Sequence, residues 1–258
     1  MAVILCHSPK GGTGTTFLAA QLALAFADRN RDVTVISTAM NDSLPLHLAL
    51  PPAVTLPDLE GQAEDAVMVQ GIDLRNCARA PRDPDFVPML QDAGLLSPAS
   101  ERVLIIDVPS GERGLAQRLL PFASLHLCAL TPAPDCVALL PQFHEELGEG
   151  ALDQTLFLVN CLDETRRLAR HTTAFLRELF GANLIGRVRQ DESVVEALAM
   201  LQTLGRYAPS SAALADVTEI AEHVLLRLAA QAELAPQPAP AQQPQTGDIA
   251  PAGKSRAA

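Results

Sequence analysis

The feature that most constrains the fold is an apolar run that leads directly into a glycine- and threonine-rich turn and then into a helical segment. Residues 3–8 read VILCHS, residues 8–17 read SPKGGTGTTF, and residues 17–30 read FLAAQLALAFADRN, with Leu and Ala recurring at helical spacing. Strand, turn and helix in such close succession are typical of α/β proteins whose parallel sheet is covered on both faces.

The same alternation continues along the chain. Further strands are predicted at residues 33–37, 103–107, 124–130, 155–160 and 183–188, and helices at residues 137–149, 164–180 and 193–204. These strands are apolar throughout and do not alternate, as expected of strands that are buried on both faces. The pattern predicts an α/β fold of the P-loop NTPase type, a doubly wound and mostly parallel sheet with helices on both faces. Ligands then bind outside the carboxyl ends of the strands.

Composition divides the chain into two parts. Residues 1–233 are predicted to form one nucleotide-binding domain, whereas residues 234–258 are rich in Pro, Ala and Gln and are expected to be a disordered tail. Residues 76–101 are rich in proline and are expected to form a loop with one short helix.

Charge and composition exclude several classes of protein. A formal net charge of −11 argues against a protein that coats DNA, and the absence of Trp with 3% aromatic residues leaves few platforms for base stacking. The five cysteines show no CxxC spacing, and Cys6, Cys128 and Cys161 lie in or beside apolar runs, so buried reduced thiols are expected. Neither a signal peptide nor a membrane-spanning run is visible, which favours a cytoplasmic protein.

The turn at residues 8–17 matches a phosphate-binding loop only in part. In the pattern G-x-x-x-x-G-K-[ST], Gly14 and Thr16 fit, but Pro9 replaces the first glycine and Thr15 replaces the lysine. A dinucleotide-binding fingerprint fits less well, because Phe17 occupies the position of its third glycine. A glycine-rich turn without a ligand remains the plain alternative. The favoured interpretation is a phosphate site at the mouth of the first helix, where free N–H groups face the turn.

Lys10 strengthens this interpretation. The segment KGGTGTT resembles the deviant Walker A signature KGGxGK[ST] of the MinD/ParA ATPases, within the SIMIBI class of P-loop proteins. The resemblance implies that Lys10 reaches the phosphates of a partner subunit across an ATP-sandwich homodimer. It also implies that ATP is cradled by the loop residues Lys10, Gly11, Gly12, Thr13, Gly14, Thr15 and Thr16.

Two later segments agree with the same family. VLIIDVPSG (residues 103–111) resembles its Walker B and switch II segment, which implies that Asp107 and Thr16 hold Mg²⁺. LVN, ending at Asn160, resembles the strand whose asparagine binds the adenine edge, although an asparagine there also suits a simple turn.

Within this family the chain is most similar, over about residues 1–230, to the BcsQ or YhjQ proteins that are encoded with bacterial cellulose synthase. The resemblance rests on HSPKGGTGTTFLAAQLA together with YAPSS and the Asp that follows. It implies an ATP-binding regulatory or assembly subunit of a cellulose or exopolysaccharide synthase complex. Accessory proteins of the synthase would be its partners and would recruit it to the inner membrane.

Two departures from the family pattern bear on catalysis. Thr15 removes the lysine inside the loop, and an ungapped alignment places Ser37 and Ala39 where the family carries the two aspartates of switch I. Asp42 lies three residues beyond. Because both missing groups act mainly on the transition state, hydrolysis should suffer more than binding, and whether the chain is an active enzyme stays open.

Direct contact with DNA or lipid is not expected. The final helical segment has Arg227 as its only Arg or Lys, and the run RRLAR (residues 166–170) reads as a solvated helix face. Two alternatives remain: an active ParA/MinD-type positioning ATPase that acts on DNA or on a pilus or secretion machine, and a scaffold that binds no nucleotide.

Overall fold

The structure is a computed structural model, and it describes residues 2–97, 102–148 and 154–234. Its strands are β1 (Ala2–Cys6), β2 (Val33–Ser37), β3 (Val67–Val69), β4 (Ile72–Asn76), β5 (Val103–Asp107), β6 (Leu125–Leu130), β7 (Thr155–Leu162) and β8 (Leu184–Arg189). Its helices are α1 (Thr15–Ala27), α2 (Leu44–His47), α3 (Phe86–Asp92), α4 (Arg113–Leu119), α5 (Pro134–Ala138), α6 (Leu140–Leu147), α7 (Arg167–Phe180), α8 (Ser193–Ala199), α9 (Leu204–Tyr207) and α10 (Ala212–Leu234). Short 3₁₀ turns occur at Ala63–Asp65, Leu120–Phe122 and Gly181–Asn183.

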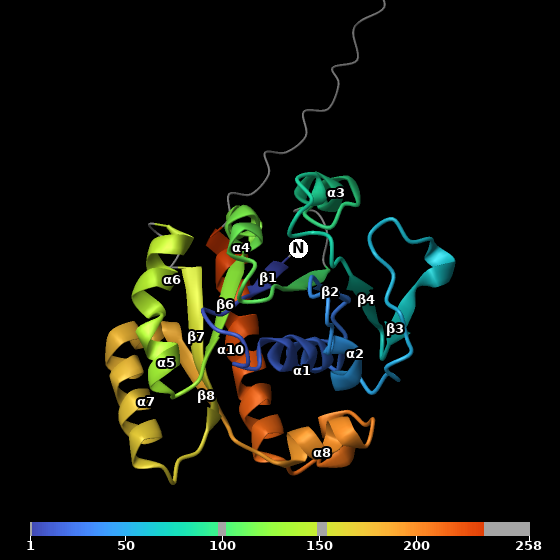
Figure 1. Ribbon diagram of the computed structural model, residues 1–258. Helices are drawn as coiled ribbons and strands as arrows, with labels where there is room; N and C mark the ends of the chain where they lie inside the picture. Colours follow the sequence, from blue (N-terminus) through green and yellow to red (C-terminus); the bar gives the residue numbers. More distant parts are fainter. Residues whose placement is uncertain (1, 98–101, 149–153, 235–258) are drawn as a thin grey trace, which may run out of the picture.

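The strands form one eight-stranded sheet in the order β3-β4-β2-β5-β1-β6-β7-β8 (Figure 1). All neighbours pair in parallel except β3, which pairs antiparallel with β4 at one edge. The predicted α/β fold with a mostly parallel sheet is therefore confirmed. Strands β3 and β4 were not predicted, because VMV is very short and IDLRN mixes polar with apolar residues.

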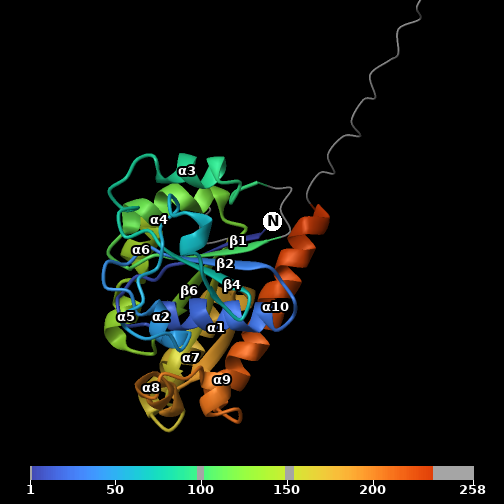
Figure 2. The ribbon, with the colours of Figure 1, turned by 90° about the vertical axis from the view of Figure 1, so that its right-hand side faces the viewer.

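Helices cover both faces of the sheet. Alternate residues of the central strands supply two apolar clusters: Ile4 and Ile105 pack toward α1 and α10, whereas Leu5 and Ile106 pack toward α3, α4, α6 and α7. Figure 2 shows α10 on one side of the strands and α4 and α6 on the other. The core is thus built almost entirely from aliphatic side chains, as the scarcity of aromatic residues requires.

The crossovers diverge at the centre of the sheet. The helix after β1, α1, packs on one face, whereas the helix after β5, α4, packs on the other. Because β1 and β5 are neighbours, their carboxyl ends form a topological switch point, and open α/β sheets bind ligands in the crevice at such a point. The glycine-rich turn and Asp107 both lie at this crevice.

Other expectations from the sequence concern the proline-rich segment, the C-terminal tail, the cysteines and membrane-spanning helices. The expected short helix within residues 76–101 is α3, and the expected disordered tail lies, after Leu234, outside the described residues. The expectation of buried reduced thiols holds for Cys6 and Cys128 but is wrong for Cys161, which is exposed. A bulge between Val159 and Leu162 causes this exposure, and it gives Cys161 a φ of 53°. Among the described helices, none is both long and apolar enough to span a membrane.

Candidate nucleotide site

The turn between β1 and α1 has the backbone of an anion-binding loop. Gly12 and Gly14 adopt left-handed conformations, with φ of 79° and 85°, which favour glycine. Gly14 is the N-cap of α1 and supplies no side-chain hydrogen bond, so the first N–H groups of this 13-residue helix point out of the loop without a side-chain cap. The positive end of the helix dipole lies at the same place, so the geometry suits a phosphate.

Asn160 stabilises this loop through a hydrogen bond to its backbone. Its Nδ2 donates to Thr13 O at 2.7 Å, and the side chain is buried at the end of β7. A Cβ added at Gly14 would lie 2.1 Å from Asn160 Nδ2, so a side chain there would displace the amide. Gly14 is therefore required both by its backbone conformation and by its close approach to Asn160. The role of Asn160 toward a base stays a prediction, since its NH₂ group already holds the loop.

Thr15 occupies the place of the usual loop lysine and turns inward. Its hydroxyl lies 2.9 Å from Ser8 Oγ and 3.1 Å from Thr13 Oγ1, while Ser8 Oγ also accepts a hydrogen bond from Ala129 N at 3.1 Å. This hydroxyl cluster ties the loop to β6. It stabilises the loop conformation but offers a phosphate no positive charge.

Thr16 and Asp107 meet at the mouth of the crevice. Thr16 Oγ1 donates to Asp107 Oδ2 at 2.6 Å, and Asp107 is 3% exposed at the end of β5. Burial raises the pKa of Asp107 to about 6; the bond from Thr16 opposes this rise, and the charge of Asp42 adds to it. No cation among the described side chains bonds to this carboxylate. A buried carboxylate without a cation, beside a hydroxyl, fits Mg²⁺, whose remaining ligands would be phosphate and water oxygens.

In such a site Thr16 and Asp107 would be the protein ligands of Mg²⁺, and the other coordination positions would be left to phosphate and water. Across residues 2–97, 102–148 and 154–234, no three His, Cys, Asp or Glu side chains gather as a metal site.

The segment after β2 is the one that the resemblance assigns to switch I. Ser37 is buried at the end of β2, in register with Asp107, and Ala39 follows it. Asp42 folds back instead: its Oδ1 accepts from Leu44 N at 2.9 Å and its Oδ2 from Asn76 Nδ2 at 2.9 Å. Both oxygens of Asp42 are thus engaged away from the crevice. Asp42 influences Asp107 only through its charge.

Lys10 has a partner within its own chain. Its ammonium forms an ion pair with the carboxylate of Asp135 at the start of α5, and both side chains are partly exposed. The hydrogen bond that Lys10 donates to Asp135 raises the pKa of Lys10. Asp135 was not singled out from the sequence, since it lies far along the chain and its segment, TPAPDC, carries no motif.

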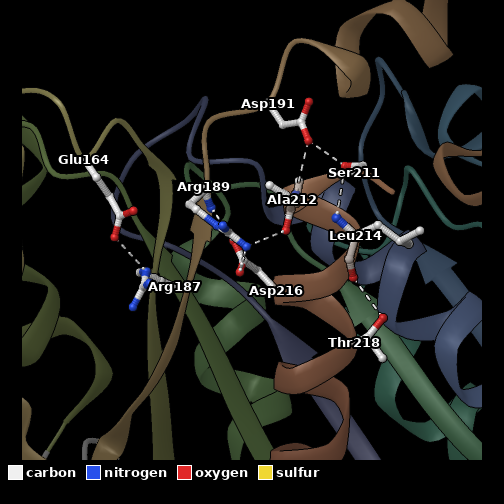
Figure 3. Close-up of polar contacts among 10 residues, drawn as sticks. Glu164, Arg187, Arg189, Asp191, Ser211, Ala212, Leu214, Asp216 and Thr218 are labelled. Atoms are coloured by element: carbon white, nitrogen blue, oxygen red, sulfur yellow. Dashed lines mark hydrogen bonds and ion pairs between the residues drawn. The ribbon is translucent and has the colours of Figure 1, made fainter. Parts of the chain in front are cut away.

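A second polar cluster fixes the segment after β8. Arg189 donates from Nε and Nη2 to the two oxygens of Asp216 on α10, at 2.8 and 2.7 Å, and Asp191 Oδ2 accepts from Ser211 Oγ at 2.7 Å (Figure 3). The bond from Ser211 lowers the pKa of Asp191 to about 2. These contacts attach the end of the sheet to α10. Arg189 also lines a cleft of about 450 Å³, together with Leu162 and Asp163.

The sequence-predicted site residues therefore lie together. Lys10, Gly11, Gly12, Thr13, Gly14, Thr15 and Thr16 form one loop, and Asp107 and Asn160 reach it from β5 and β7. Sequence reasoning missed Asp135, and it also missed Asn76, which holds Asp42.

Comparison with protein families shows to which family the chain belongs. The profile described as "Cellulose biosynthesis protein BcsQ" matches residues 87–225, more than half of the chain. The chain belongs to the BcsQ family. The match includes Asp107 and Asn160 of this BcsQ family member, whereas the loop at residues 8–16 lies before the matched segment. No curated protein matches the sequence significantly.

Solved structures show what fold this BcsQ family member shares. A ParA family ATPase from Chlorobium tepidum superimposes with a TM-score of 0.70 at 18% identity, over 86% of this chain and 98% of that one. MinD from Pyrococcus horikoshii, complexed with Mg-ADP, gives a TM-score of 0.67 at 19% identity, over 86% and 95% of the two chains. An ATP complex of McdA from Cyanothece gives 0.66 at 18% identity, over 89% and 96%. At these identities, the likeness establishes the MinD/ParA fold.

Proposed function

We propose that this chain binds ATP with Mg²⁺ at the loop of residues 8–16, dimerises around the nucleotide, and serves as a regulatory or assembly subunit of a bacterial cellulose or exopolysaccharide synthase complex. Its hydrolysis of ATP is slow or absent. The observation that carries the binding proposal is the 2.6 Å contact between Thr16 Oγ1 and Asp107 Oδ2 at the mouth of α1. A hydroxyl and a carboxylate meet there beside free helix N–H groups, as a magnesium nucleotide needs.

Each residue has a distinct role in this proposal. The N–H groups after Gly12 and Gly14 cradle the phosphates, Thr16 and Asp107 hold the Mg²⁺ shell, and Asn160 keeps the loop in place. The ion, when bound, neutralises phosphate charge. The ATP and Mg-ADP complexes of McdA and MinD support the choice of ligand.

Slow turnover follows from two substitutions. The Thr15 hydroxyl is hydrogen-bonded to those of Ser8 and Thr13 and brings no positive charge to the phosphates. Ala39 has no carboxylate to orient water. Phosphoryl transfer is catalysed by positioning and by charge stabilisation, so both losses fall on the transition state. Loop N–H groups contact the ground state and the transition state alike, so binding is retained.

Lys10 supports the dimer. Its side chain lies at the surface beside the loop, where exchange of Asp135 for a phosphate of a second subunit would let it bridge two copies. Bound ATP then holds the two subunits of the dimer together. The role in cellulose synthesis rests on membership of the BcsQ family, and fold alone would not supply it.

Calorimetry tests binding, and light scattering after size-exclusion chromatography tests assembly. We expect heat of binding with Mg-ATP and a shift from monomer to dimer with ATP. Lys10→Ala should abolish the dimer and keep binding, whereas Lys254→Ala, which changes the only other lysine, should behave as wild type. Absence of heat with Mg-ATP or Mg-ADP would refute the nucleotide site.

Genetic complementation tests the pathway. Loss of the gene should reduce cellulose or exopolysaccharide output, and the Lys10→Ala chain should fail to restore it. Fast ATP turnover together with salt-sensitive DNA binding would instead favour a positioning ATPase.

A further inference from the structure

A polar cleft lies apart from the nucleotide loop, between α1, α9 and α10. It measures about 380 Å³, within the range of small-molecule sites, and it shares no residue with the loop at residues 8–16. Gln70, in the β3–β4 turn, closes one side, and Leu214 and Thr218 of α10 form another. Figure 3 shows these two residues on successive turns of α10, where Thr218 Oγ1 donates to Leu214 O at 2.8 Å.

Gln21 is the unusual residue of this cleft. It is the one polar side chain within residues 17–26, FLAAQLALAF, and it is 4% exposed in the middle of α1. Within the described part of the chain, no group forms a hydrogen bond with its side-chain amide, although the residue lines the cleft. The amide atoms are not among the fully enclosed side-chain atoms without a partner, so the amide is open to the cleft and is available to a ligand there.

The rest of the lining indicates what could satisfy this amide. Arg29 and Arg206 stand at the cleft with one acidic residue, Asp28, so the lining carries a net positive charge in a chain of net charge −11. Arg29 is already paired with Glu222 and bonded to Ala25 O. Arg206 is exposed and has no ion-pair partner among the described residues.

Apolar side chains complete the cleft, with Leu24 and Ala25 on α1 and Val217 on α10. A pocket with an apolar wall, one unpaired amide open to the cleft and an available guanidinium selects for a compact molecule with three features. The molecule would carry a carboxylate or phosphate for Arg206, a donor or acceptor for Gln21, and a small apolar part.

We propose that this cleft binds a small carboxylate- or phosphate-bearing molecule, which is anchored by the Gln21 amide and the Arg206 guanidinium. The site is separate from the ATP site. It therefore does not depend on the function proposed above.

Nuclear magnetic resonance can locate binding at each site. The side-chain NH₂ signal of Gln21, assigned by its loss in Gln21→Leu, reports on the cleft, and the backbone N–H signals of Gly12 and Gly14 report on the loop. Citrate and inorganic phosphate are the probes, with sodium chloride at equal ionic strength as the control. The two anions distinguish a carboxylate site from a phosphate site.

We expect one of these anions to shift the Gln21 signal in a saturable manner. Arg206→Gln should weaken that binding by tenfold or more, whereas Arg31→Gln, at an exposed arginine outside the cleft lining, should leave it unchanged. At ten times Kd the anion should raise Tm by about 3 °C in the wild type and not in Gln21→Leu.

Three results would overturn the proposal. The anions could shift Gly12 and Gly14 only, sodium chloride could shift Gln21 equally, or Arg31→Gln could weaken binding as much as Arg206→Gln. Loss of the Gly12 and Gly14 response alone would count against the nucleotide site and leave the cleft unaffected.

Discussion

Lys10 is paired with Asp135, which lies 125 residues further along the chain at the start of α5. The resemblance implies that Lys10 binds a phosphate held by a neighbouring subunit. In this structure its ammonium is instead bound to a carboxylate of its own chain. In the proposed dimer, Lys10 would exchange Asp135 for a phosphate of the partner, so the ion pair would compete with assembly.

The first prediction concerns this competition. Asp135→Asn removes the charge that holds Lys10, so dimerisation with Mg-ATP should strengthen by a factor of about two to five, the scale of an exposed ion pair. Sedimentation equilibrium measures the change, and Asp163→Asn, at a carboxylate bonded to Arg166, is the matched control. A weaker dimer in Asp135→Asn would show that Asp135 helps assembly.

A second prediction concerns Gly14. Gly14→Ala should destabilise the fold by at least about 2 kcal/mol, because the alanine must adopt a left-handed conformation and displace Asn160 Nδ2. Gly114→Ala in α4, where an added Cβ meets no atom within 4 Å, should cost nothing or add stability. Urea unfolding compares the two, and equal midpoints would contradict the close approach.

The third prediction follows from the raised pKa of Asp107, about 6. Mg²⁺ requires the ionised carboxylate, so its affinity in the ATP complex should be nearly full at pH 7.5 and fall about tenfold between pH 7.5 and pH 5. Calorimetry at several pH values measures this change. Asp107→Asn should bind Mg²⁺ weakly at every pH and lose the dependence beyond that of ATP itself.

Buried histidines give a fourth prediction. Burial lowers the pKa of His7 to about 4 and that of His126 to about 3, whereas an unfolded histidine titrates near 6.5. Between pH 4 and 6.5 the unfolded chain binds more protons, so these residues contribute stability that is fully present above pH 6.5 and is lost as pH falls. Each should cost on the order of 1–2 kcal/mol of unfolding free energy between pH 7 and pH 5.

Asp107 has the opposite effect on the pH dependence of stability. The pKa of its carboxyl is higher in the folded chain than in the unfolded chain, so ionisation of Asp107 lowers the unfolding free energy as pH rises. Urea unfolding at pH 7 and pH 5 measures the net slope. His126→Gln should reduce this slope, whereas His171→Gln, at an exposed histidine on α7, should not. A slope that is unchanged in His126→Gln would contradict its neutral state.

The fifth prediction concerns the missing catalytic groups. Thr15→Lys should tighten Mg-ATP binding about tenfold or more, since a charge-assisted contact is worth roughly 1.5–3 kcal/mol. Turnover should rise further in Thr15→Lys with Ala39→Asp, which supplies a carboxylate to switch I. Phosphate release measures turnover, and Thr15→Ser, which keeps the hydroxyl beside Ser8 and Thr13, is the control. Fast turnover of the wild type would refute the argument.

Much of the architecture is local information and could be predicted from the sequence. A buried parallel strand needs a continuous apolar run, and a left-handed turn before a helix needs glycine, so VLIID and KGGTGTT predict their structure without reference to distant residues. The edge strand pair β3 and β4 escaped prediction because an edge is only partly buried, and IDLRN lacks the apolar pattern that burial imposes.

The sequence by itself determined the central apolar strands and the longer helices, the glycine-rich loop and the residue types available to hold phosphate and Mg²⁺. Tertiary structure alone decided the partners: Asn160 beneath Thr13, Asp135 on Lys10, and Gln21 facing a cleft instead of another side chain. The physical reason is that hydrogen bonds and ion pairs act over a few ångströms in space. Their partners here lie more than a hundred residues apart in the chain, so no local pattern encodes them.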